Sequence, residues 1–90
     1  MKLTISESVA IDNFSDYTII TKIKDGEIDF SKAVVLEKSA KFIINLIQKN
    51  KTFDEIITAL TVEYGISPQV AKKDLETFIK ELKEKGILND

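Results

Sequence analysis

The spacing of apolar residues changes about 36 residues into the chain. Before that point, apolar residues are mostly β-branched and stand in short runs between polar turns, as in residues 17–24 (YTIITKIK). After it, they recur with the three-to-four-residue period of amphipathic helices. The pattern predicts an α+β domain, with a β region over about residues 3–36 followed by a three-helix region over about residues 37–88.

The β region is predicted to form a three-stranded antiparallel sheet. Asp25-Gly26 follows the clearest strand and favours a type I′ hairpin turn, because both central residues of that turn need a positive φ. The return strand covers residues 27–36, with a bulge or a break at Ser31-Lys32. A weaker strand is expected earlier, within residues 3–11, with a turn over residues 13–16.

The first helix is expected over residues 37–49. Its apolar residues at i, i+1, i+4 and i+5 form one buried stripe, which consists of Phe42, Ile43, Leu46 and Ile47. Ile44 lies off this stripe. Two explanations for Ile44 stay open: contact with the edge of the sheet, or part of a surface for a partner.

The second helix has signals at both ends. Thr52 and Glu55 form a Thr-x-x-Glu capping box at its start, and Gly65 supplies the left-handed residue at its end. Its apolar stripe consists of Phe53, Ile56, Ile57, Leu60 and Tyr64.

The third helix follows after a short joint. Ser67 is the expected N-cap, and Pro68 takes the first helical position, where its missing N–H costs nothing. Gly86 ends the helix, and Ile87 or Leu88 folds back onto it. The predicted buried face consists of Ala71, Leu75, Phe78, Ile79 and Leu82.

Composition excludes whole classes of function. The chain has 90 residues, which suits one domain, and it contains no Cys, His or Trp. Without Cys or His, the usual serine, cysteine and zinc catalytic sites cannot form. The three glycines are far apart, so they form no phosphate-binding loop. We therefore expect a single domain over residues 1–90 that is not an enzyme and has no catalytic residue, metal or cofactor.

The charges give no sign of a nucleic-acid partner. All 13 basic residues are Lys, and the formal net charge is −2. Residues 1–36 contain 4 Lys and 6 acidic residues, and residues 37–90 contain 9 of each. Neither part has the basic excess of a polyanion-binding surface. With no apolar run near the ~20 residues that span a bilayer, and no signal-peptide core, a cytoplasmic location is expected.

An ordered set of short motifs runs through the second part of the chain. It consists of an apolar strand ending at Leu36, Thr52-Phe53-Asp54-Glu55-Ile56, Leu60 with Tyr64, Asp74-Leu75, Phe78-Ile79, Leu82 and Gly86-Ile87-Leu88. This set resembles the PqqD-like family, the peptide-recognition modules called RiPP recognition elements. Many family members have Leu-Asn at the junction of strand and helix, where this chain has Leu36-Glu37.

The resemblance implies a fold and a function. The fold is a winged helix-turn-helix-like arrangement, with a three-stranded antiparallel sheet followed by three helices. Such modules bind the leader segment of a ribosomally synthesised precursor peptide. The leader adds a strand along the third strand, against the third helix, and the module presents the precursor to a modifying enzyme, commonly a radical SAM protein. A monomer or weak homodimer is expected, without nucleic acid or membrane.

Edge strands support this mode independently, because their unpaired N–H and C=O groups can pair with an extended peptide. The predicted edge consists of Ala33, Val34, Val35 and Leu36. The predicted wall on the third helix consists of Val70, Lys73, Asp74, Thr77 and Phe78, with Lys73 placed to pair with an acidic leader residue. A structural alternative exists for these residues. Val34, Val35 and Phe78 also suit the core, and Lys73, Asp74 and Thr77 also suit a solvated helix surface.

Two other functions stay open. A winged-helix DNA-binding protein would use the third helix for recognition, but residues 67–85 carry five Lys and four acidic residues, and no Arg for bidentate contacts to guanine. A generic protein–protein adaptor would copurify with its partner and ignore extended peptides.

Overall fold

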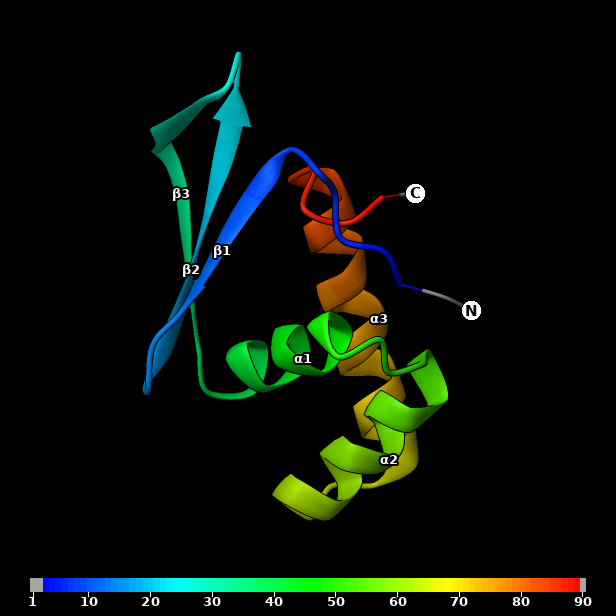
Figure 1. The fold of residues 1–90 in the computed structure, drawn as a ribbon. Coiled ribbons are helices and arrows are strands. Elements are labelled where there is room, and N and C mark those ends of the chain that lie inside the picture. The colour runs from blue at the N-terminus through cyan, green and yellow to red at the C-terminus, as the bar shows by residue number, and fades with distance from the viewer. Residues whose placement is uncertain (1–2, 90) are drawn as a thin grey trace.

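The computed structural model describes residues 3–89 of the chain. It contains a three-stranded antiparallel sheet followed by three helices, which confirms the predicted α+β class and the order of the elements (Figure 1). The sheet has the strand order β1-β2-β3. The elements are β1 Val9–Asn13, β2 Tyr17–Lys24, β3 Glu27–Glu37, α1 Lys38–Gln48, α2 Phe53–Tyr64 and α3 Pro68–Glu84. None of the helices in this part of the chain has the length and hydrophobicity of a membrane span.

β2 and β3 form the hairpin that the sequence predicts. Asp25 and Gly26 have φ angles of 54° and 78°, as a type I′ turn requires. β3 continues from Glu27 to Glu37, so Ser31-Lys32 lies in a bulge and not in a break. The tip of the hairpin projects past the end of α3 (Figure 1).

The first strand lies later in the sequence than predicted. β1 overlaps the expected range of residues 3–11 only at its end, and Asn13 belongs to the strand rather than to the turn. The residues before β1 pair with the C-terminal tail instead. The Ser6 N–H donates to the Ile87 carbonyl at 2.8 Å, and the Asn89 N–H donates to the Thr4 carbonyl at 2.9 Å. Leu3 is buried in the core, so hydrophobic burial draws this segment away from the sheet.

The helix ends follow the sequence signals. Thr52 and Glu55 form both hydrogen bonds of the capping box, and Gly65 is left-handed with a φ of 63°. The Ser67 hydroxyl accepts from the Val70 N–H at 3.2 Å at the start of α3. After α3, the Ile87 N–H donates back to a carbonyl in the last turn of the helix at 2.8 Å. The predicted caps are confirmed.

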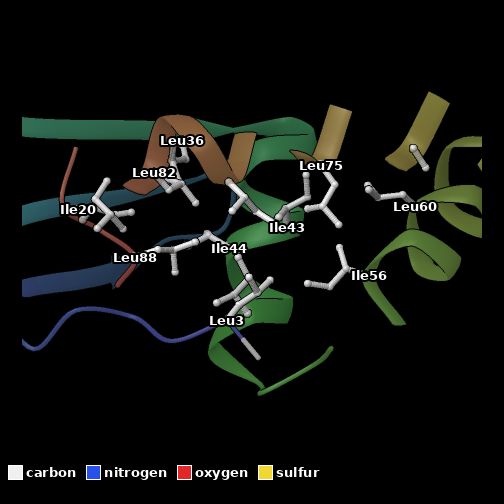
Figure 2. Packing of buried hydrophobic residues seen from close by; sticks show 14 residues of the cluster. Leu3, Ile20, Leu36, Ile43, Ile44, Ile56, Leu60, Leu75, Leu82 and Leu88 are labelled. Carbon is white, nitrogen blue, oxygen red and sulfur yellow. The ribbon is translucent and has the colours of Figure 1, made fainter. Parts of the chain in front are cut away.

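The core shows one clear error in the sequence interpretation of α1. Ile44, which lies off the predicted stripe, is completely buried, whereas Phe42 is only half-buried. The partner-surface explanation of Ile44 is therefore wrong. Figure 2 shows Ile44 in the middle of the cluster, with Ile20 of the sheet on one side and Ile56 of α2 on the other. Because α1 is covered on two sides, its buried surface is wider than one stripe. The buried cluster consists of Leu3, Ile20, Leu36, Ile43, Ile44, Ile47, Ile56, Leu60, Ala71, Leu75, Ile79, Leu82, Ile87 and Leu88.

Candidate functional site

β3 is an outer strand of the sheet, with β2 as its neighbour on one side. The hydrogen bonds between β1 and β2 determine which peptide groups of β3 are free. The Phe14 N–H donates to the Tyr17 carbonyl, and the Ile23 N–H donates to the Ser8 carbonyl, both at 2.8 Å. Peptide groups alternate in direction along an antiparallel strand. The odd-numbered residues of β2 therefore face β1, and the even-numbered residues face β3.

Between Val34 and Glu37, this alternation leaves two residues of β3 with outward peptide groups. Val34 and Leu36 lie opposite even-numbered residues of β2, so they form the hydrogen bonds between the two strands. Val35 must then direct its N–H and C=O groups, and Glu37 its N–H group, away from the sheet, while the C=O of Glu37, the N-cap of α1, accepts the first hydrogen bond of that helix. The free edge offers an extended chain alongside it two donors, the N–H groups of Val35 and Glu37, and one acceptor, the C=O of Val35.

Side chains along this edge alternate between the two faces of the sheet. Leu36 is buried and Val34 is half-buried, both on the face that packs against the helices. Val35 is 54% exposed. Val34 and Leu36 thus hold the edge in place, while Val35 presents a free peptide group and an accessible side chain.

A bulge interrupts the regular pairing immediately before this edge. Ile20 lies opposite Val34, but Lys22 lies opposite Asp29, so the four residues 30–33 of β3 face one residue of β2. The Asp29 carboxylate accepts hydrogen bonds from the hydroxyl and the N–H of Ser31. These bonds, the hydroxyl first, hold the pKa of Asp29 below its ordinary value. The charged carboxylate therefore stabilises the bulge.

A hollow of about 460 Å³ lies between the bulge and the C-terminal end of α3. We call it the bulge hollow. It is lined by Ile20, Thr21, Lys22, Lys32, Ala33, Val34, Glu84, Lys85 and Ile87. The apolar lining comes mainly from β2, β3 and the C-terminal tail. Lysine residues line it from the sheet, through Lys22 and Lys32, and from the end of α3, through Lys85.

A second hollow of about 330 Å³ lies where the three helices meet, near the start of α1. We call it the helix hollow. It is lined by Lys38, Ser39, Ile43, Leu60, Tyr64, Ile66 and Asp74. Tyr64 was predicted to belong to the buried stripe of α2, but it is 43% exposed and packs its ring against the edge of Phe42, with 5.6 Å between ring centroids. Its exposure leaves an aromatic wall on this hollow.

One face of α3 connects the two hollows. Asp74, Phe78, Glu81 and Lys85 are spaced at i, i+4, i+7 and i+11, so they lie on one side of the helix. Asp74 lines the helix hollow, and Lys85 lines the bulge hollow. We call the free edge of β3, the two hollows and this face of α3 the β3–α3 groove.

The structure brings together most of the predicted site residues. Ala33 and Val34 line the bulge hollow, Val35 and Leu36 belong to the adjoining edge, and Asp74 lines the helix hollow. On α3, Phe78 is half-buried on the groove face, and Val70 lies one turn before Asp74 and is 48% exposed.

Two predicted wall residues differ from the others on α3: Lys73 lies off the groove face, and the Thr77 hydroxyl is bonded within its own helix. Lys73 is one residue from Asp74, which turns it about 100° around the helix, away from the groove face. The Thr77 hydroxyl donates to the Lys73 carbonyl at 3.1 Å, within its own helix.

Sequence reasoning missed the lysines of the bulge hollow. Lys22, Lys32 and Lys85 are far apart in the sequence and meet only because the bulge and the end of α3 face one another. The sequence indicates the two elements separately, as a possible bulge at Ser31-Lys32 and a helix end at Gly86. Their relative position depends on the packing of α3, which the sequence pattern does not give.

Comparison with known protein families matches residues 19–88 to the family described as "Coenzyme PQQ synthesis protein D (PqqD)". The chain belongs to the PqqD family. This confirms the resemblance found in its motifs. A relative in Gluconobacter oxydans (strain 621H), named "PqqA binding protein", is 34% identical over 58 residues, which are 64% of this chain and 60% of that protein. The chain thus matches less than two thirds of that relative's length.

Two solved structures have the same fold as this PqqD-family chain. The structure titled "TbiB1 in Complex with the TbiA(beta) Leader Peptide" has a TM-score of 0.84 and 23% identity, over 96% of this chain and 94% of that chain. The structure titled "Lasso peptide synthetase B1 complexed with the leader peptide" also has a TM-score of 0.84, with 17% identity over 100% of both chains. The likeness supports the observed arrangement of sheet and helices.

Proposed function

We propose that this domain binds the leader segment of a ribosomally synthesised precursor peptide and presents it to a modifying enzyme. The leader adds a fourth strand beside β3 and lies in the β3–α3 groove. The observation that carries the proposal is the pair of outward peptide groups at Val35 and Glu37, with a hollow at each end of the adjoining groove. The names of the PqqA-binding relative and the leader-bound structures support the same ligand class.

Energetics require that the hollows contribute to binding. The two residues offer at most three backbone hydrogen bonds, each with a net value of about 0.5–1.5 kcal/mol. Their sum of about 1.5–4.5 kcal/mol is less than the about 8 kcal/mol that a micromolar Kd needs, before any cost of ordering the peptide. Side chains of the leader must therefore fill the hollows, and this gives the interaction its sequence preference.

The domain itself performs no chemistry in this proposal. It raises the concentration of the precursor at its enzyme, and the family resemblance favours a radical SAM enzyme as that partner. Residues 1–90 act as one module, as a monomer or weak homodimer. The DNA-binding alternative gains no support from α3, where four Lys are balanced by four acidic residues and no Arg is present.

Replacing Val35 with proline tests the strand-addition step. Val35→Pro removes one outward N–H, and proline is tolerated at an edge position whose N–H faces solvent. Val35→Ala keeps the N–H and shortens the same side chain, so it is the matched control. We expect Val35→Pro to weaken leader binding about tenfold and Val35→Ala to change it little. The ligands are synthetic leader segments from small open reading frames beside the gene, measured by fluorescence anisotropy.

The proline variant must first show the circular dichroism of the native protein. If folded Val35→Pro binds with the affinity of the original chain, the leader does not pair with this edge of β3. If the original chain binds none of the leader segments, the proposed function itself is wrong.

A further inference from the structure

The bulge hollow has an excess of positive charge that the rest of the chain does not share. Lys22, Lys32 and Lys85 line it together with one carboxylate, that of Glu84, whereas the formal net charge of the chain is −2. Asp29, in the adjoining bulge, interacts electrostatically with Lys32, so the three ammonium groups against these two carboxylates leave one positive charge around the concave space. Such a concentration favours a negatively charged ligand at that point.

One of the three lysines has a structural role as well. Lys22 is half-buried, and its ammonium lies so close to Gly86 that a Cβ at position 86 would collide with it. Gly86 follows the C-terminal end of α3, where the helix dipole places about half a negative charge. That partial charge offsets Lys22 only in part. Lys32 and Lys85 are exposed on opposite sides of the hollow, so their ammonium groups are available to a ligand.

We infer that the bulge hollow is a subsite for an acidic side chain, Asp or Glu, of the bound peptide, which pairs with Lys32 and Lys85. This inference rests on the proposed function and specifies what the groove selects. The apolar floor of Ile20, Val34 and Ile87 contacts the aliphatic part of the side chain, while its carboxylate meets the ammonium groups at the rim. The sequence analysis predicts Lys73 as the partner of an acidic leader residue, but Lys73 lies about 100° around α3 from the groove face.

The geometry also predicts where the acidic residue lies in the peptide. Asp74 and Lys85, which line the two hollows, are eleven positions apart on α3, or about 16 Å along the helix axis. An extended peptide covers that length in about five residues. Side chains on one face of a strand recur at even spacing, so spacings of four residues (about 13 Å) and six residues (about 20 Å) bracket this length. An apolar residue that enters the helix hollow therefore stands four or six residues from the acidic one.

Selection from a random peptide library displayed on messenger RNA tests this assignment. Three proteins serve as targets: the original chain, Lys32→Glu with Lys85→Glu, and Lys72→Glu with Lys80→Glu. The third target has the same change in net charge at exposed positions outside the lining of the hollow. The single variant Lys32→Glu replaces the second target if the change at Lys85, the C-cap of α3, disturbs the fold.

We expect Asp or Glu at one fixed distance from an apolar anchor in peptides selected by the original chain and by the third target. Peptides selected by the second target should lose that acidic residue or replace it with Lys. In a selected peptide, changing the acidic residue to its amide should weaken binding to the original chain about tenfold and leave binding to the second target unchanged.

Two results would overturn the inference in different ways. If all three proteins select the same peptides without a fixed acidic position, the subsite is wrong and leader binding survives. If none of the three proteins selects any peptide, the proposed function fails and the subsite fails with it.

Discussion

At the scale of single residues, burial decides which substitutions matter. Ile44 is completely buried between the sheet and the other helices, although periodicity alone places it beside the buried stripe of α1. Val62, in α2, is 80% exposed. Both are β-branched residues inside helices, so they differ mainly in how much surface folding removes from water.

Replacing Ile44 or Val62 with alanine should lower the free energy of unfolding by very different amounts. Ile44→Ala removes completely buried atoms and leaves a cavity, so we expect the free energy of unfolding to fall by about 2–4 kcal/mol. Val62→Ala should change it by less than about 0.5 kcal/mol, since the side chain is exposed. Urea denaturation followed by circular dichroism measures both. Equal effects in the two variants would contradict the burial of Ile44.

At the scale of elements, the start of α2 depends on a charged carboxylate. The Thr52 N–H donates to Glu55 Oε1 at 2.8 Å, and the Glu55 N–H donates to Thr52 Oγ1 at 3.1 Å. The bond from the Thr52 N–H, followed by that with the Thr52 hydroxyl, holds the pKa of Glu55 below its ordinary value. A carboxyl group whose pKa is lower in the folded state stabilises that state when it is ionised.

The contribution of Glu55 to the stability of the fold therefore falls as the pH is lowered. The contribution of Glu55 is complete above the unfolded-state pKa of Glu, about 4.3, and is lost as the pH falls through the lower pKa of the folded state. We expect Glu55→Gln to be less stable than the original chain near pH 7, with the difference shrinking toward about pH 3. Urea denaturation at both pH values measures it. A stability difference that stays constant or grows in acid would contradict the charged capping box.

Element by element, the sequence predicts the sheet well but not the site on its edge. Asp25-Gly26 fixes the hairpin because few residue pairs allow two positive φ angles in succession. The groove face of α3 was predicted in part, through Asp74 and Phe78. The bulge shifts pairing by several residues, and its extent depends on contacts such as the Ser31–Asp29 hydrogen bonds. The sequence therefore indicates the bulge and the end of α3 separately, but not that their lysines lie close together.

At the scale of the whole molecule, the helices form a platform that fixes an edge strand beside a helix. α1 follows β3 directly, and its residue Ile43 contributes to both the core and the helix hollow. Residues in the first half and at the end of α3 contribute to the two hollows. A peptide in the β3–α3 groove would therefore meet a site whose walls are joined to the buried core.

The most direct measurement of leader recognition is an amide NMR titration of the labelled protein with leader segments from neighbouring small open reading frames. Scrambled versions of the same segments are the control. The account predicts saturable shifts concentrated on residues 33–37 of β3 and on 74–85 of α3, absent with the scrambled peptides. Saturable shifts located on β1 or on the outer side of α2, or equal responses to scrambled peptides, would contradict it.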